Sequence, residues 1–397
     1  MTSDFSQAVG IPATKSYSLL ALAFCLLVNV TNEAPAQSFV QTGLNSIDTP
    51  VDPRSIAMAE SFVALRNNSM ALMYNPAGLA SARGVSLSYS HRRLNWLDDL
   101  SSTKYFALAT SLETPIVNIG LLYNRFEQGE FIITGPESPE EAGRAKVYDY
   151  VLGLGVARSF GNHWDIGLTV KTYNVVETIT GASIPVYPLE TTHRPYLLDF
   201  GVIYSHPDVI RTESSDDEFA VAVALQNFGT DFKIKAAGFR SDSSPPMMIE
   251  TLLKLPRYLR FGVSYSLTIM PQSKEKLTPF KFLITGEYRN FLNPGTYQKA
   301  DRDFWGLGIE ATFLDILAAR VGGYIAPYSS IYGERATPHF RYGVGVNLPL
   351  ARIGVDSPIS IRMDYAGIPV RNPGFSRVEN STLKAFCFGL TYEEEIF

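Results

Sequence analysis

The most constraining feature of this chain is an alternation of large apolar side chains with small or polar ones between residues 84 and 392. It recurs in roughly fourteen segments of about 9 to 13 residues. In the segment 258–267, Phe261 and Val263 alternate with Arg260 and Gly262. Each segment therefore has one apolar and one polar face. The lengths match the roughly 9 to 11 residues with which a tilted strand crosses a bilayer. We predict an all-β membrane protein, an antiparallel transmembrane β-barrel of about 14 strands.

The connections between these segments alternate in length. Residues 161–162 and 314–315 leave only about two residues between neighbouring segments, as in a tight hairpin. Three other connections are long, and we expect residues 127–147, 176–194 and 229–256 to be outer loops. Outer-membrane barrels have short periplasmic turns and longer outer loops. An even strand count in this phase places both ends of the barrel on the periplasmic side.

Charged residues inside the segments share the parity of glycine, serine and threonine. They are Asp165, Lys171, Asp199, Lys281, Glu287, Glu310, Arg320, Arg362 and Asp364. A Lys or Arg facing lipid at mid-bilayer would cost roughly 2 to 4 kcal/mol, so this face is predicted to line the lumen. Lys384 is the exception, near a strand end from which it can reach the headgroups. A soluble sandwich with these charges on its solvated face is the alternative.

The amino terminus has the pattern of a secretory leader. Lys15 precedes the apolar residues 18–28, and Ala34 and Ala36 form a small-x-small cleavage pattern. We predict a signal peptide at residues 1–36, cleaved after about Ala36, and an outer-membrane location. The apolar run is too short to span a bilayer as a helix; a buried core helix is the alternative. After cleavage only Cys387 remains, which excludes an internal disulfide.

Composition and motifs argue against several kinds of chemistry. A formal net charge of -5 gives no nucleic-acid footprint, and 24 Phe and 21 Tyr suit interfacial aromatic belts. The five histidines are scattered without metal-ligand spacing, and no nucleophile or phosphate-loop motif occurs. We predict no enzyme activity, no cofactor and no metal. Glu137, Glu140 and Glu141 suggest a calcium site, but such a run is usually a solvated surface.

Residues 37–83 precede the first predicted strand and do not alternate. We expect helices and turns there, forming a hatch in the lumen, with the barrel at residues 84–397. The abundant lumen-side glycines indicate that something packs closely against the inner wall. The most distinctive run of the hatch is Asn75, Pro76, Ala77, Gly78 and Leu79. It is either an element that gates a ligand or a turn, which Asn and Pro favour locally.

The hatch resembles the amino-terminal region of the PorV/PorQ family, outer-membrane barrels of the fatty-acid-transporter (FadL-like) type. The resemblance rests on residues 54–65 (RSIAMAESFVAL) and 74–79 (YNPAGL). Weaker blocks follow in family order at residues 198–204, 224–229, 255–262 and 362–366. The chain departs from the family at Ala59 and Glu60, where a glycine-initiated pair is usual, and in the acidic residues 393–395 before its terminal Phe397.

The resemblance implies a fourteen-stranded barrel with a hatch that enters from the periplasm, and a role in the type IX secretion system. There, long outer loops would bind or shuttle secreted cargo proteins and contact secretion and attachment subunits. The alternative is FadL-like transport of a hydrophobic small molecule past the hatch. Both functions place the chain in the lipid bilayer. A soluble secreted β protein is a third hypothesis, distinguished by recovery without detergent.

Overall fold

The computed structural model describes residues 45–48, 50–94, 103–134, 140–181, 190–210, 215–238, 247–269, 277–292, 303–325, 328–329, 334–335, 338–370 and 381–394. The predicted signal peptide, residues 1–36, and the start of the predicted hatch lie outside these ranges. No helix within them is long and apolar enough to cross a membrane.

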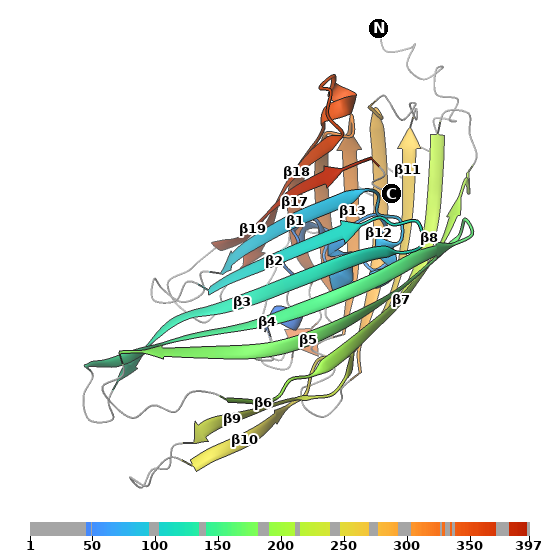
Figure 1. Ribbon diagram of the computed structural model, residues 1–397. Helices are drawn as coiled ribbons and strands as arrows, with labels where there is room; N and C mark the ends of the chain where they lie inside the picture. The colour runs from blue at the N-terminus through green and yellow to red at the C-terminus, as the bar shows by residue number, and fades with distance from the viewer. Residues whose placement is uncertain are drawn as a thin grey trace.

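Fourteen antiparallel strands form one closed barrel, in which the first strand pairs with the last (Figure 1). The strands are β1 (Val85–Leu94), β2 (Thr103–Leu112), β3 (Asn118–Thr134), β4 (Glu141–Phe160), β5 (Trp164–Thr180), β7 (Tyr196–Pro207), β8 (Ser215–Gly229), β11 (Tyr258–Ile269), β12 (Phe280–Phe291), β13 (Phe304–Phe313), β14 (Leu317–Ile325), β17 (Pro338–Pro349), β18 (Ile359–Val370) and β19 (Ser381–Tyr392). The 14-stranded antiparallel barrel predicted from the alternation is confirmed. Because the sheet closes on itself, the sandwich alternative is wrong.

The two faces of the barrel wall divide as the alternation predicts. Phe261, Val263 and Val344 are on the outer face, with 43%, 47% and 54% of their surface exposed. Asp199 and Glu287 point inward and are buried. This polarity, apolar outside and polar inside, is the arrangement that a lipid-facing barrel requires. Lys384 lies on the outer face near the start of β19, as expected of the one exception.

The short turns at one end of the barrel follow from local backbone chemistry. The β13–β14 hairpin turns through Leu314 and Asp315, whose φ angles are 53° and 54°. Two positive φ angles are those of a type I′ turn, whose twist matches the twist of the flanking strands. Between β17 and β18, the 3-10 helix η5 (Leu350–Ile353) makes a longer connection that ends at Gly354, with a φ of 90°.

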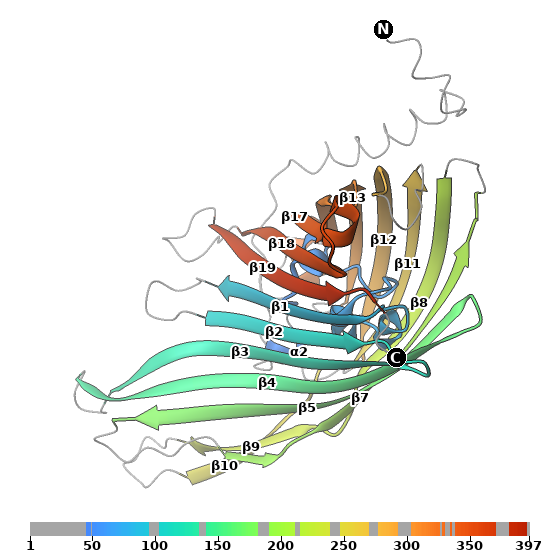
Figure 2. The same cartoon turned by 45° about the horizontal axis from the view of Figure 1, so that its top comes forward.

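The regions predicted as outer loops are largely strand, which corrects that expectation. β3 and β4 pair as far as Thr134 and Glu141, and β5 continues to Thr180 (Figure 2). Alternation hid these extensions because a bulge at Gln128 shifts the register between Glu127 and Gly129. Beyond the bulge the outer face carries the charges of Glu130, Arg144 and Lys146 in addition to Ile132, so the apolar alternation is broken there.

Part of the third predicted loop, 229–256, is also strand. β9 (Phe232–Gly238) pairs with β10 (Met247–Leu253) and with β6 (Glu190–His193) in a separate sheet. This sheet packs on the inner wall, where the rings of Phe232 and Tyr173 meet edge to face at 5.0 Å. Two further residue pairs, β15 (Tyr328–Ser329) and β16 (Glu334–Arg335), form a small hairpin.

The segment before β1 lies inside the barrel, as the blue ribbon enclosed by strands in Figure 2 shows. It contains the helices α2 (Asn45–Asp48) and α3 (Pro53–Ala57) and the 3-10 helices η2 (Ser69–Met73) and η3 (Pro76–Leu79). Its side chains from Ile56 to Leu65 are almost completely buried. We call residues 45–84 the plug. The expected lumenal hatch of short helices and turns is therefore present.

Candidate functional site

The plug is built from short turns, each started by a side chain that caps it. The Asp52 carboxylate accepts a hydrogen bond from Ser55 N at 3.1 Å, and Pro53 opens α3. The side chain of Asn68 caps η2 in the same way, and that of Asn75 accepts from Ala77 N at 3.0 Å to cap η3. Asn and Asp favour these positions because their side-chain oxygens reach the unpaired N–H groups of a helix start. The plug can thus hold its shape without long helices.

Glycines of the wall give the plug backbone its seat. A side chain at Gly201 would overlap the Asn75 side chain, and one at Gly167 would overlap the backbone of Pro76 and Ala77. The same relation recurs along the plug: Gly155 faces Leu72, Gly262 faces Val63, Gly308 faces Met58 and Gly322 faces Ala59. The inference that something packs against the lumen-side glycines is confirmed.

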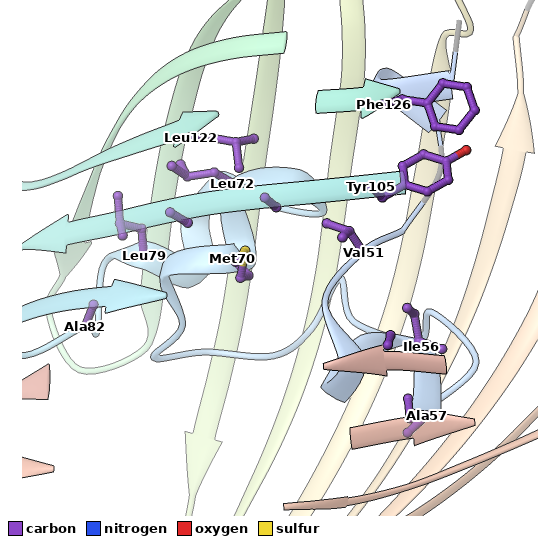
Figure 3. Close-up of a cluster of buried hydrophobic side chains, with 14 of the residues drawn as sticks. Val51, Ile56, Ala57, Met70, Leu72, Leu79, Ala82, Tyr105, Leu122 and Phe126 are labelled. Carbon is purple, nitrogen blue, oxygen red and sulfur yellow. The ribbon is translucent and has the colours of Figure 1, made fainter. Parts of the chain in front are cut away.

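An apolar cluster joins the plug to the wall formed by β2, β3, β4, β18 and β19 (Figure 3). Leu72 and Leu79 from the plug pack with Leu122 of β3, while Met70 lies deeper in the same cluster. The rings of Tyr105 and Phe126 meet at 4.3 Å on its upper edge. Burial of such side chains contributes on the order of 2 kcal/mol each. On this side the lumen is filled.

Polar side chains of the wall bind the backbone of the plug. The amide of Asn118 donates to the carbonyls of Leu79, Ala80 and Ala82. The Glu287 carboxylate accepts from Phe62 N and Val63 N, both at 2.9 Å. Glu287 also pairs with Arg260, which donates to the carbonyl of Glu60. These contacts satisfy plug groups that no regular secondary structure would satisfy.

Charged plug residues pair with the inward charges of the wall. Arg54 makes two hydrogen bonds to Glu310, at 2.7 and 2.9 Å. Arg66 pairs with Asp165 at 2.7 Å and with Glu218 at 2.9 Å. Because removing one member of a buried pair leaves the other charge unpaired, each pair resists displacement of the plug.

Glu60 occupies the most strained position of the plug. Ala59 and Glu60 both have left-handed backbones, with φ angles of 52° and 60°. This turn directs the Glu60 carboxylate to Arg341 at 2.9 Å and Arg289 at 3.4 Å. Burial raises the pKa of Glu60, but the two guanidinium groups outweigh burial and hold its pKa below the ordinary value.

The remaining candidate residues show no arrangement for chemistry. Within the described ranges, no three His, Cys, Asp or Glu side chains gather as a metal site would require. His163 and His206, distant in sequence, stack with ring centroids 5.4 Å apart at the end with short turns. Glu141 pairs with Arg144 at 2.5 Å, whereas Glu137 lies outside the described residues. The feature best suited to a function is therefore the plug and the wall around it.

An apolar hollow of about 620 Å³ marks the outer face of the wall beside the plug. The outward side chains of Leu108, Leu121, Leu152, Leu154, Val170 and Tyr196 surround it. Leu122 and Gly153 also line it although they belong to the inward parity, so the sheet itself forms the floor. Leu122 packs with Leu72 and Leu79 of the plug. Hollow and plug core thus face each other across a single sheet layer.

Comparisons with known proteins place no family on this chain. No family model matches, and no curated protein matches. Solved structures with a similar chain trace include the toluene transporter TodX of Pseudomonas putida. The two sequences are 10% identical, the alignment covers 86% of this chain and 98% of that chain, and the TM-score is 0.45. The toluene transporter TbuX of Ralstonia pickettii has 11% identity, the same coverage and a TM-score of 0.45. A FadL homologue of Pseudomonas aeruginosa has 11% identity, again with that coverage, and a TM-score of 0.41. At these values we transfer neither family nor function from them.

The sequence located part of this site. It singled out Asn75, Pro76, Ala77, Gly78 and Leu79, which the structure places together at the seat formed by Gly167 and Gly201. It missed the hollow, because the lining residues come from β2 to β5 and β7 and carry only the ordinary apolar parity of the outer face. It also missed Glu287 as a ligand of the plug backbone, since inward charges signal a lumen without naming a partner.

Proposed function

We propose that this chain is an outer-membrane barrel that takes hydrophobic small molecules through its lipid-facing wall beside the plug. The hollow on the outer face carries this proposal. Its lining is almost wholly apolar, and a hydrophobic molecule concentrated in the bilayer would reach it without crossing water. A straight route along the barrel axis meets the plug, whose backbone and charges the wall binds at many points.

The run Asn75 to Leu79 is then the proposed gate. Only the sheet layer around Gly153 separates the hollow from the cluster of Leu72 and Leu79. A small movement of η3 away from its glycine seat would open space behind that layer. The cap by Asn75 and the bond from its Nδ2 to Val63 O at 2.8 Å would hold the closed state.

Filling the hollow tests this function. Val170→Trp places a large ring in the hollow from the outer face, whereas Val221→Trp places one on the outer face of β8, away from it. Uptake of radiolabelled toluene by cells that carry the barrel should fall to the background level with Val170→Trp and stay unchanged with Val221→Trp. Heat-shifted migration on gels verifies folding. Equal uptake by both variants and the unaltered barrel would reject the proposal.

A second candidate is a component of the type IX secretion system that binds secreted cargo and partner subunits, the function implied by the PorV/PorQ resemblance. The β6–β9–β10 sheet favours it, because a rigid sheet packed at the barrel mouth is a suitable recognition surface. Deleting residues 232–253 should then reduce secretion and remove co-purifying partners while leaving toluene uptake intact. Unchanged secretion would count against this candidate.

Both functions require export of the chain. If the leader is cleaved after Ala36, amino-terminal sequencing of the mature protein should show Gln37 as its first residue.

A further inference from the structure

The three longest strands continue past the point where their neighbours end. β2 pairs with β3 only as far as Glu127, whereas β4 pairs with β3 to Thr134. On the other side, β7 pairs with β5 only as far as Thr172, whereas β4 pairs with β5 to Thr180. We call residues 128–134, 141–147 and 174–180 the ribbon. Figure 1 shows it projecting from the barrel at the lower left.

Side-chain chemistry places the ribbon outside the hydrocarbon. On the outer face of the wall, Tyr123 and Tyr150 meet at 6.1 Å, and Arg125 lies over the Tyr148 ring at 3.8 Å, as in an interfacial belt. Past this belt, the outer face of the ribbon carries Arg144 and Lys146, both exposed. Charges at this level would be costly in lipid and cost little in water.

One edge of the ribbon has the properties of an unpaired strand. Among the described residues, β3 from 128 to 134 has a partner on its β4 side only. Its residues Phe131, Ile132 and Ile133 have high β propensity, and Phe131 and Ile132 are 44% and 54% exposed. Natural proteins often protect such an edge with Lys or Pro, and this stretch contains neither; its only protective features are the bulge at Gln128 and the charge of Glu130.

We propose that this β3 edge binds an extended segment of a second protein, which adds to the ribbon as a further strand. Backbone hydrogen bonds along about seven residues would supply affinity, and side-chain contacts would supply selectivity. Apolar residues of the segment would lie beside Phe131 and Ile133 on one face. On the other face, a Lys or Arg of the segment would lie beside Glu130 and share its carboxylate with Arg144, at 3.4 Å, and Lys146, at 3.6 Å.

A second copy of this chain fits the edge less well. Two barrels inserted in one membrane point their β3 strands in the same direction, so β3 could meet β3 only in a parallel pair. Parallel pairs are the slightly less stable kind. The proposal concerns the ribbon alone and goes beyond the proposed transport, which the hollow would perform on the opposite side of the Tyr123 and Tyr148 belt.

Designed peptides test the proposal on the intact barrel in detergent. Three labelled eight-residue peptides alternate Val and Thr: one has a central Lys, one a central Glu and one a central Pro. Fluorescence anisotropy should show that the Lys peptide binds up to about fivefold more tightly than the Glu peptide. The Pro peptide should not bind, because Pro removes a ladder hydrogen bond. Binding of all three with equal affinity, or of none, would overturn the proposal.

Variants locate the edge. Glu130→Lys should reverse the preference between the Lys and Glu peptides, and Phe131→Lys should abolish binding of both. Thr178→Lys, on the β5 edge of the same ribbon, should leave binding unchanged. Loss of binding with Thr178→Lys but not with Phe131→Lys would show that the peptide binds the β5 edge, and would overturn the assignment to β3. Sedimentation of the peptide-free barrel gives a further check: a dimer that Phe131→Lys dissociates would identify a second copy as the occupant. Toluene uptake should be the same in all three variants.

Discussion

Ala59 and Glu60 show how a single backbone angle fixes the plug. A left-handed conformation costs a non-glycine residue roughly 1 to 2 kcal/mol, and here two such residues adjoin. The turn persists because Glu60 then reaches Arg341 and Arg289. The local strain is thus offset by buried ion pairs on the far side of the lumen.

Replacing Ala59 by glycine should relieve this strain. We expect Ala59→Gly to raise the free energy of unfolding by about 0.5 to 1 kcal/mol, seen as a higher unfolding temperature of the purified barrel. Ala57→Gly provides the matched control, since Ala57 lies in the right-handed helix α3 and its methyl group is buried. That change should destabilise the barrel by about 1 kcal/mol. The same sign for both variants would contradict this account of the turn.

The glycine seat makes a second prediction. Gly201→Ala should displace the Asn75 side chain and destabilise the plug by about 1 to 3 kcal/mol, because the new methyl group overlaps it. At Gly286 the nearest atom to an added Cβ is 3.7 Å away, so Gly286→Ala should be close to neutral. Limited proteolysis of the plug in the folded barrel measures the effect. Equal protease resistance of the two variants would show that the close approach at Gly201 is unimportant.

The sequence predicted the role of a residue only where that role depends on whether the side chain points inward or outward from its strand. Alternation correctly assigned Asp165, Glu287 and Glu310 to the lumen, because a charge on the lipid side is costly. It could not show that Glu287 accepts from Phe62 N, some 225 positions away. Such partners depend on how the plug lies in the closed barrel, and no local pattern encodes that position.

At the scale of elements, strand positions followed from the alternation, and strand ends did not. The segment expected near Arg257 is β11, which begins at Tyr258. β4, expected near Tyr148, begins at Glu141. The difference has a physical cause: alternation was read as lipid outside and lumen inside, and the ribbon reverses that polarity where it leaves the bilayer. The plug was anticipated as an element, but its fit to the wall glycines needed the structure.

The contact between plug and wall should depend on pH through Glu60. Its pKa is lowered in the folded barrel, so its stabilising contribution is complete above its ordinary value of 4.5 and is lost as the pH falls through the folded pKa. The unfolding temperature of the unaltered barrel should therefore fall more between pH 7 and pH 3 than that of Glu60→Gln. At pH 7, Glu60→Gln should cost roughly 3 kcal/mol, because Arg341 loses its carboxylate.

Asp52 changes the stability with pH in the opposite direction to Glu60. Because Asp52 is present in both the unaltered barrel and Glu60→Gln, its contribution cancels when the two pH profiles are compared. Burial raises the pKa of Asp52, so its contribution to stability is present at low pH and is lost as the pH rises through the folded pKa. Glu394→Gln, at an exposed end of the chain, serves as a control and should leave the pH profile unchanged. A profile of Glu60→Gln parallel to that of the unaltered barrel would show that Glu60 does not carry the dependence.

At the scale of the whole molecule, the apolar outer face and the charged ribbon define where the hydrocarbon ends. Leu154 and Ile132 are both on the outer side and similarly exposed, at 51% and 54%, but they lie on opposite sides of the belt of Tyr123 and Tyr150. We expect Leu154→Arg to destabilise the barrel in a bilayer by roughly 2 to 4 kcal/mol, and Ile132→Arg by about 1 kcal/mol or less.

Unfolding of both variants in lipid vesicles measures this difference. The same two variants in a short-chain detergent should differ much less, because a micelle adapts to a local charge more readily than a bilayer does. Equal losses of stability for the two variants in vesicles would place Ile132 in the hydrocarbon, and would contradict the position of the ribbon in water.

The pairing of β1 with β19 also constrains how the molecule is assembled. The plug immediately precedes β1, and its bulk is wider than any gap between hydrogen-bonded strands. It cannot be threaded into a finished cylinder from the side. We therefore expect the later hairpins to wrap around the leading segment, and the seam between β1 and β19 to form last, with the plug already inside. A barrel that closed before the plug was inside would have an empty lumen, in which Arg289 and Arg341 would face water instead of Glu60.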